Sequence, residues 1–106
     1  MYCNAIISPN FPFNYNNYID KDFSVEVDAG KKIQIIFSEF NLEANSRCYW
    51  DWVTVFDGDG TELLPKTCGT NKPTSAIVSK TNRAIVHFHS DYSVTRKGFS
   101  AYWKCK

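Results

Sequence analysis

Short runs in which apolar and polar residues alternate recur along this chain, and they limit its possible folds more than any other feature. Phe23, Val25 and Val27 alternate with polar residues, and segments 33–37 and 99–104 continue the pattern. A period of two places the apolar side chains on one face of a β-strand. The sequence has no run of ten or more residues with the spacing of an amphipathic helix. It therefore predicts an all-β domain whose strands each bury one face.

Turn residues separate these runs and predict how the strands connect. The turn at 28–30 lies between segments 23–27 and 33–37, so we expect these two strands to form a hairpin. A second tight turn is predicted at 57–60, because its Asp and Gly residues tolerate a positive φ. With 106 residues, 43% of them hydrophobic, the chain can fill one sandwich-sized core but not two. We therefore expect a single domain over residues 1–106, built from two packed antiparallel sheets.

The balance of charges and the cysteines narrow the class of protein. Twelve basic and eleven acidic residues give a net charge of +1 without any long basic block, so no nucleic-acid partner is expected. No apolar run approaches the roughly 20 residues that span a bilayer, so we expect no transmembrane segment. The four cysteines have no zinc-finger spacing, and two disulfides are the better interpretation. Because disulfides persist in oxidising compartments, the chain is predicted to be secreted or extracellular.

The sequence lacks the common motifs of catalysis but carries a pair of histidines. It contains no G-x-S-x-G, no H-E-x-x-H and no phosphate-binding glycine loop, so we expect no enzymatic activity. His87 and His89 alternate with Val86 and Phe88 and share one face of a predicted strand, a geometry that can bind a transition metal. Because the sequence indicates no third ligand, we interpret the pair as surface residues that face away from the core.

Eight short motifs follow one another along the whole chain. They occupy residues 8–15, 30–33, 40–43, 48–53, 56–58, 68–69, 90–93 and 98–101. In this order and at this spacing they resemble the CUB domain family from end to end. The resemblance implies a jelly-roll-like β-sandwich of two antiparallel sheets, found in extracellular proteins.

The resemblance also implies how the cysteines pair. Cys48 and Cys68 stand in the two motifs that a family disulfide usually links. A second family disulfide normally joins an N-terminal cysteine to one just before the second strand, and this sequence departs from that pattern because segment 21–23 has no cysteine. Cys3 and Cys105 are then left, and we expect them to pair with each other.

A calcium site follows from the same resemblance. Glu43, Asp51 and Asp91 match the acidic positions that hold Ca²⁺ at one end of the sandwich in calcium-binding members. Three converging carboxylates would repel one another unless a cation neutralised them. Ca²⁺ takes about six to eight oxygen ligands, and the remaining ones are expected from water and from the backbone carbonyls of Ser93 and Val94. Many calcium-binding members have a polar residue where Val94 stands, so a weakened affinity is expected.

The resemblance points to protein recognition. In calcium-binding members the acids also pair with a lysine or arginine of a partner, and Tyr15 matches a tyrosine that hydrogen-bonds an acidic ligand, with a further expected role in lining the binding surface. We therefore predict a non-catalytic, calcium-dependent recognition module of a larger extracellular protein, such as a metalloprotease. The alternative is a calcium-independent domain resembling the spermadhesins, which binds glycans or self-associates. The three acids favour the first prediction.

The tryptophans offer a second candidate surface, because aromatic faces can stack on sugars. Trp50 occupies the family's aromatic position before an acidic ligand, and we interpret it as a core residue. Trp52 alternates with Val53, so it is the tryptophan expected to contribute to an exposed surface. Oligomeric state does not follow from the sequence.

Overall fold

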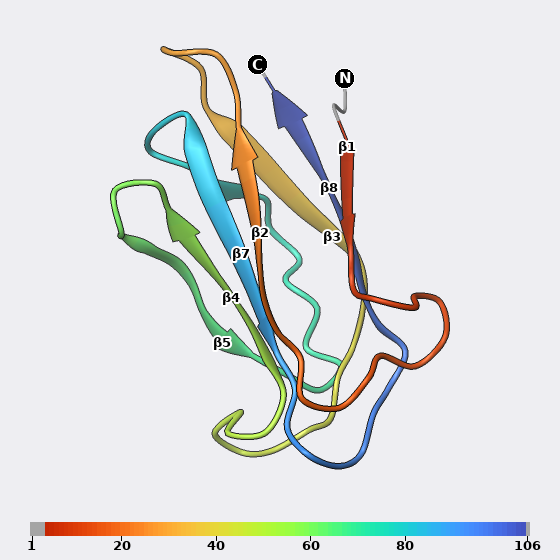
Figure 1. Cartoon of the computed structure of the whole chain (residues 1–106). Helices are drawn as coiled ribbons and strands as arrows, with labels where there is room; N and C mark the ends of the chain where they lie inside the picture. Colours follow the sequence, from red (N-terminus) through yellow and green to blue (C-terminus); the bar gives the residue numbers. More distant parts are fainter. Residues whose placement is uncertain (1–3, 106) are drawn as a thin grey trace.

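The computed structural model describes residues 4–105, in which it contains eight β-strands. The strands are β1 (Asn4–Ile7), β2 (Asp20–Glu26), β3 (Ile33–Asn41), β4 (Trp52–Asp57), β5 (Glu62–Thr67), β6 (Ile77–Val78), β7 (Arg83–His89) and β8 (Gly98–Cys105). One sheet has the strand order β1-β8-β3-β6 and the other β2-β7-β4-β5, and all neighbours are antiparallel. Figure 1 shows the two sheets as separate layers. In the part of the chain described, no helix could cross a membrane. The predicted two-sheet antiparallel sandwich is confirmed.

The hairpin predicted between the second and third strands is wrong. β2 pairs with β7 along its whole length, and β3 pairs with β8 and β6 in the opposite sheet. The chain therefore passes from one layer to the other between these strands (Figure 1). Alternation specifies which face of a strand is buried, but it does not specify the strand beside it. The hairpin predicted around 57–60 is confirmed, because β4 pairs with β5 across that turn.

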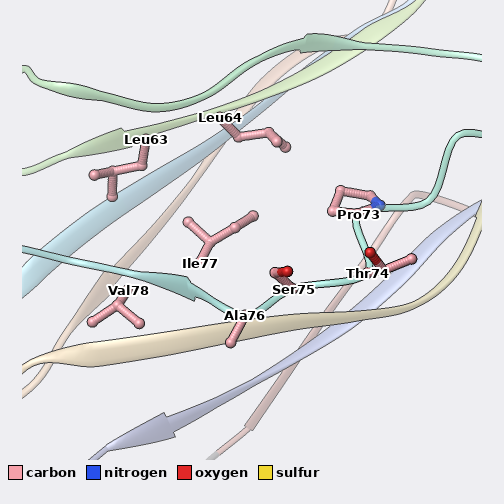
Figure 2. A pocket seen from close by; sticks show the side chains of 8 residues that line it. All are labelled: Leu63, Leu64, Pro73, Thr74, Ser75, Ala76, Ile77 and Val78. Atoms are coloured by element: carbon pink, nitrogen blue, oxygen red, sulfur yellow. The ribbon is translucent and has the colours of Figure 1, made fainter.

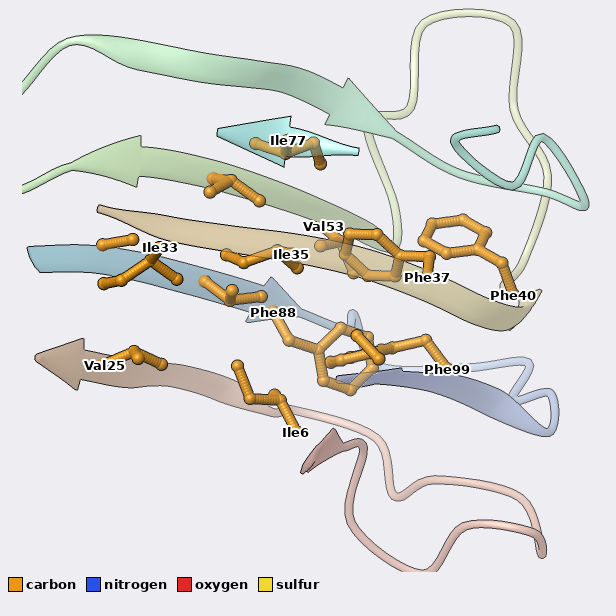
Figure 3. Close-up of a cluster of buried hydrophobic side chains, with 14 of the residues drawn as sticks. Ile6, Val25, Ile33, Ile35, Phe37, Phe40, Val53, Ile77, Phe88 and Phe99 are labelled. Carbon is orange, nitrogen blue, oxygen red and sulfur yellow. The ribbon is translucent and has the colours of Figure 1, made fainter. Parts of the chain in front are cut away.

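The core lies between the inward faces of the two sheets. Ile33, Ile35 and Phe37 alternate on β3, and Val86 and Phe88 alternate on β7, and all five side chains are buried. Figure 3 shows these faces meeting, with the aromatic rings near one end of the sandwich. Burying an aliphatic or aromatic side chain of this size stabilises the fold by roughly 1.5–3 kcal/mol. The alternating pattern thus identified the core-facing residues of both strands correctly.

A β-bulge in β3 changes which residues face the core. The register with β8 shifts between Phe37 and Glu39, and the Ser38 hydroxyl donates a hydrogen bond of 3.0 Å to the carbonyl of Ser100. One extra residue reverses the alternation of a strand. Phe40 is therefore buried after the bulge, as is Leu42 just beyond the strand. Glu43 follows Leu42 directly, at the end of the sandwich.

The turn between β4 and β5 is fixed by a buried carboxylate that the sequence did not reveal. Asp57 accepts hydrogen bonds from the backbone N–H groups of Lys80 (2.6 Å), Thr81 (3.0 Å) and Asp59 (3.0 Å). Burial alone would raise the pKa of Asp57, but these bonds outweigh it and hold the pKa well below its usual range. Asp57 therefore connects the turn to the segment that leads into β7.

Three loops gather at one end of the sandwich, at the bottom of Figure 1. They are residues 8–19 between β1 and β2, 42–51 between β3 and β4, and 90–97 between β7 and β8. Backbone hydrogen bonds join loops 8–19 and 90–97, since the N–H of Tyr15 donates to the carbonyl of Arg96 (3.0 Å) and the N–H of Tyr18 donates to the carbonyl of Asp91 (2.8 Å). Side chains from distant parts of the sequence are thereby brought to one place.

Candidate metal centre

Three carboxylates converge where these loops meet. Glu43 and Asp51 come from loop 42–51 and Asp91 from loop 90–97, and one oxygen of each lies within 4.8 Å of the other two. Glu43 is only 7% exposed and Asp51 is fully buried at 0%. Carboxylates at such distances repel one another when all are ionised. These are the three acidic residues that the sequence predicted as ligands, and the structure places them together.

Tyr15 holds two of these residues in place. Its hydroxyl donates a hydrogen bond to Asp51 Oδ2 and accepts one of 3.1 Å from the backbone N–H of Glu43. Its ring packs edge-on against Phe88 with 5.0 Å between ring centroids. Burial, followed by the bond to Asp51, raises the pKa of Tyr15 far above its ordinary value, so the hydroxyl keeps its proton. Tyr15 is itself buried, and the expectation that it also lines a binding surface is wrong.

Asp51 is oriented from both sides of its carboxylate. While Oδ2 accepts from Tyr15, Oδ1 accepts a hydrogen bond of 2.9 Å from the backbone N–H of Asp91. Burial raises the pKa of Asp51, and the two hydrogen bonds oppose that rise. Each oxygen still has a second lone pair for a ligand. Asp51 is therefore the fixed member of the cluster.

Glu43 is the member with an oxygen that lacks a hydrogen-bond partner. Its Oε1 is buried and accepts no hydrogen bond from any residue that the structure describes. Burial, and then the charges of Asp51 and Asp91, raise the pKa of Glu43 to about 7, although the guanidinium of Arg96 partly opposes the rise. A buried carboxylate without a partner is costly for a fold. A cation placed among the three carboxylates would reduce their repulsion and would give Glu43 Oε1 a partner.

The loop that carries Asp91 has an unusual backbone. Val94 has a φ of 58°, in the left-handed region where a β-branched residue is strained. The backbone N–H of Ser93 donates a hydrogen bond of 3.3 Å to Asp91 Oδ1. Ser93 and Val94 thus stand in the same loop as Asp91, and the use of their carbonyl oxygens as ligands stays a prediction.

A glycine without a side chain allows the loops to approach this closely. Gly98 has a φ of 98°, and a Cβ atom there would lie 1.9 Å from Ser8 Oγ and 3.4 Å from the ring of Tyr15. Ser8 Oγ occupies that space because it accepts a hydrogen bond of 3.0 Å from the N–H of Phe99. Only glycine fits this position without displacing Ser8, at the start of the loop that carries Tyr15.

The disulfide between Cys48 and Cys68 is present, as predicted, with 5.5 Å between the two Cα atoms. It ties loop 42–51, which carries Glu43 and Asp51, to the segment just after β5. Closing a loop with a sequence separation of 20 stabilises a fold by roughly 3 kcal/mol in the chain-entropy model. The expected pairing of Cys3 with Cys105 lies outside the described residues.

One of the two expectations about the tryptophans fails in the structure. Trp50 is 45% exposed, so its interpretation as a core residue is wrong. Trp52 stacks on the imidazole of His89 with 4.0 Å between ring centroids, and Lys66 Nζ lies 4.0 Å from the centroid of the same ring. A ring covered in this way offers little area to a sugar.

Two exposed tyrosines beside the acidic cluster were not identified from the sequence. Tyr18 is 78% exposed and Tyr92 is 69% exposed. They line a groove of about 410 Å³ together with Ile19, Asp20, His89, Ser90 and Asp91. The only sequence signal for this surface is that Tyr92 directly follows an expected calcium ligand.

A second hollow, shown in Figure 2, lies away from the acidic cluster between β5 and β6. It has a volume of about 370 Å³ and is lined by Leu63, Leu64 and residues 73–78. None of these residues is ionisable. The hollow therefore offers neither a cation site nor an acid or base.

Comparison with known proteins identifies the fold family. A family model described as "CUB domain" matches residues 2–103. The chain belongs to the CUB domain family. Protein SpAN of Strongylocentrotus purpuratus is 35% identical to it over 99 residues, which is 93% of this chain and 16% of that protein. The domain thus spans a small part of the relative that it matches. CUB domains are non-catalytic modules, and relatives of this one are larger extracellular proteins.

Solved structures agree with this assignment. The full extracellular region of zebrafish Gpr126/Adgrg6 superposes with a TM-score of 0.88 at 31% identity, over 96% of this chain and 13% of that one. The MASP-1 CUB2 domain bound to Ca²⁺ superposes with a TM-score of 0.84 over 94% of this chain and 89% of that one. At 21% identity, the second likeness shows the shared fold alone. The extracellular location of this CUB domain agrees with its disulfide.

Proposed function

We propose that this CUB domain binds Ca²⁺ through Glu43, Asp51 and Asp91 and that the loaded site recognises a lysine or arginine of an extracellular partner protein. The buried Glu43 Oε1, which has no hydrogen-bond partner in the described chain, carries the proposal. A carboxylate in that position favours a bound cation, because two further carboxylates have oxygens within 4.8 Å of it.

The donor set favours calcium over softer metals. All three side chains offer hard carboxylate oxygens, which suit Ca²⁺, whereas the described part of the cluster has no sulfur or imidazole ligand. Backbone carbonyls of Ser93 and Val94 and water would complete the shell. Tyr15 would orient Asp51 from behind. The calcium bound to MASP-1 CUB2 supports the choice of ion, because that domain has the same fold.

The partner would meet the domain at the groove beside Asp91. A lysine or arginine head could pair with the outer oxygens of the carboxylates while its aliphatic stem lies on the exposed rings of Tyr18 and Tyr92. Calcium would keep the three acids in place and the cation of the partner would add a charge-assisted contact. The domain would then act as a single recognition module in a larger extracellular protein, such as a metalloprotease.

Calorimetric titration of Ca²⁺ into chelator-treated domain tests the metal site. Saturable one-site binding is expected in the native sequence and is expected to be lost in Asp51→Asn, which keeps the shape of the side chain but removes its charge. Asp28→Asn is the matched control, since Asp28 lies exposed in the segment between β2 and β3 and should leave binding unchanged. Equal binding by native protein and Asp51→Asn would refute the assignment.

Recognition of a cation is tested separately with Nα-acetyl-lysine methylamide as the probe. Amide NMR signals of residues 90–92 and of Tyr18 are expected to shift with this probe in the presence of Ca²⁺. The Nε-acetylated probe, which lacks the positive charge, should leave them unchanged. Identical shifts with both probes would show contact without charge recognition and would contradict the proposal. A glycan or a second copy of the chain that binds without calcium would favour the alternative function.

A further inference from the structure

The outer face of the β2-β7-β4-β5 sheet carries an unexpected cluster of imidazoles and carboxylates. In the register of β2 with β7, Asp20 lies opposite His89 and Asp22 lies opposite His87. Val86 and Phe88 point into the core, so the two histidines face outward on the same side of β7, as the sequence predicted. The four side chains thus form a ladder on the surface.

One carboxylate oxygen joins the two histidines. Asp20 Oδ1 lies 2.8 Å from His87 Nε2 and 3.3 Å from His89 Nδ1. In a tetrahedral zinc site with metal–ligand bonds of about 2.0–2.1 Å, neighbouring ligand atoms stand roughly 3.3 Å apart. The distance from Asp20 Oδ1 to His89 Nδ1 equals this spacing, and the distance to His87 Nε2 is shorter than it. Asp20 is the third ligand, which the sequence did not reveal, and the pairing of β2 with β7 places it beside the histidines.

Asp22 and Trp52 orient the two histidines. Asp22 Oδ1 hydrogen-bonds His87 Nδ1, which leaves Nε2 of the same ring to face Asp20. A carboxylate on the far nitrogen of an imidazole fixes its tautomer and strengthens it as a ligand. The ring of His89 is held against Trp52. Both histidines are therefore oriented by a neighbour that is not itself a ligand.

We propose that Asp20, His87 and His89 bind a divalent transition-metal ion such as Zn²⁺, at a site separate from the acidic cluster. Two imidazole nitrogens and one carboxylate suit Zn²⁺ and exclude Ca²⁺, which prefers oxygen ligands alone. The two sites thus differ in donor chemistry as well as in position. Water would fill the open coordination positions, because the site lies on the surface.

Binding requires a small rearrangement. Among the described residues only the acidic cluster has all its ligand atoms within 4.8 Å of one another. The nitrogens of His87 and His89 lie on either side of Asp20 Oδ1 and do not yet converge on one point. All three side chains are partly exposed, so the imidazoles can rotate toward a shared ion without disturbing the core.

Titration of Zn²⁺ into calcium-saturated domain tests the proposal, because calcium then occupies any acidic site. One saturable Zn²⁺ site per chain is expected. Asp20→Asn and His89→Ala should each lower the affinity at least tenfold, and Asp22→Asn should lower it roughly tenfold, since loss of a supporting carboxylate costs about 10–100-fold. Asp28→Asn is the control, because Asp28 is exposed in the segment between β2 and β3, outside both proposed sites, and its replacement should leave zinc affinity unchanged.

Fluorescence gives a second measurement, because His89 stacks on Trp52. Cu²⁺ bound at the site is expected to quench Trp52 emission saturably in the native domain and not in His87→Ala. Absence of saturable zinc binding at about 1 mM would overturn the proposal. Zinc binding that survives His89→Ala but disappears in Asp91→Asn would also overturn it, since the ion would then occupy the acidic cluster.

Discussion

Replacing Glu43 with glutamine is expected to stabilise the calcium-free domain at pH 8. Without a metal, burial and the charges of Asp51 and Asp91 raise the pKa of Glu43 from 4.5 to about 7. Between these values the folded protein retains a proton that the unfolded chain releases, so the free energy of unfolding falls as the pH rises. The decrease in the free energy of unfolding is complete above pH 7 and absent below pH 4.5.

The size of the effect follows from the same pKa. One pKa unit corresponds to about 1.4 kcal/mol, so a rise from 4.5 to about 7 sets a ceiling of about 3 kcal/mol. Water reaching the mouth of the site lowers this to about 2 kcal/mol. Glu43→Gln removes the buried charge and with it most of this loss. In excess Ca²⁺ the order should reverse, because only the native domain gains the binding energy of the ion.

Urea unfolding at pH 5 and pH 8, in chelator and in Ca²⁺, measures these differences. Glu62→Gln serves as the matched control, because Glu62 is exposed at the start of β5 and should follow the native protein throughout. The reasoning would be refuted if the native domain in chelator were equally stable at both pH values. It would also be refuted if Glu43→Gln were no more stable than the native domain at pH 8.

Three further substitutions test the scaffold around the site. Asp57→Asn should lower the free energy of unfolding by about 2–4 kcal/mol, because charge-assisted hydrogen bonds are lost. Since the pKa of Asp57 is depressed, chemical denaturation should show this loss throughout pH 5–8. A loss confined to one end of that range would contradict the prediction. Gly98→Ala should lower the melting temperature more than Gly60→Ala, because both glycines have positive φ but only Gly98 lacks room for a Cβ; equal losses would count against the predicted clash. Val94→Asn should raise the free energy of unfolding by about 1 kcal/mol, since asparagine tolerates the left-handed region, and an unchanged value in urea unfolding would show that Val94 is not strained.

Much of the fold was predictable because alternation reports burial directly. The core residues of β3 and β7 follow from their spacing of two. Strand pairing did not follow, because β2 and β3 are adjacent in sequence and carry the same pattern, yet lie in different sheets. A pattern along one strand contains no information about its neighbour unless a short turn joins them. The short turn between β4 and β5 supplied that information, and that pairing was predicted correctly.

The candidate site divides in the same way. Glu43, Asp51 and Asp91 could be selected because family motifs place them, and their convergence is a property of three loops meeting at one end of the sandwich. The environment of each acid could not be predicted. Asp51 accepts hydrogen bonds from the Tyr15 hydroxyl and the Asp91 N–H, whereas Glu43 Oε1 accepts none, and these contacts depend on how the loops meet. The predicted burial of Trp50 and the predicted exposure of Tyr15 were wrong for a similar reason, since tertiary contacts decide which ring is covered.

The distribution of hydrogen bonds within the cluster indicates what calcium would change. Asp51 is held by Tyr15 and by the backbone of Asp91 without any metal, and backbone hydrogen bonds join loops 8–19 and 90–97. The scaffold of the site is therefore expected to persist in calcium-free protein. Glu43 is the exception, because its pKa of about 7 makes a proton compete with the ion for the same carboxylate near neutral pH. Calcium would thus replace a proton in a largely formed site, so its affinity should rise with pH while the fold around it stays the same.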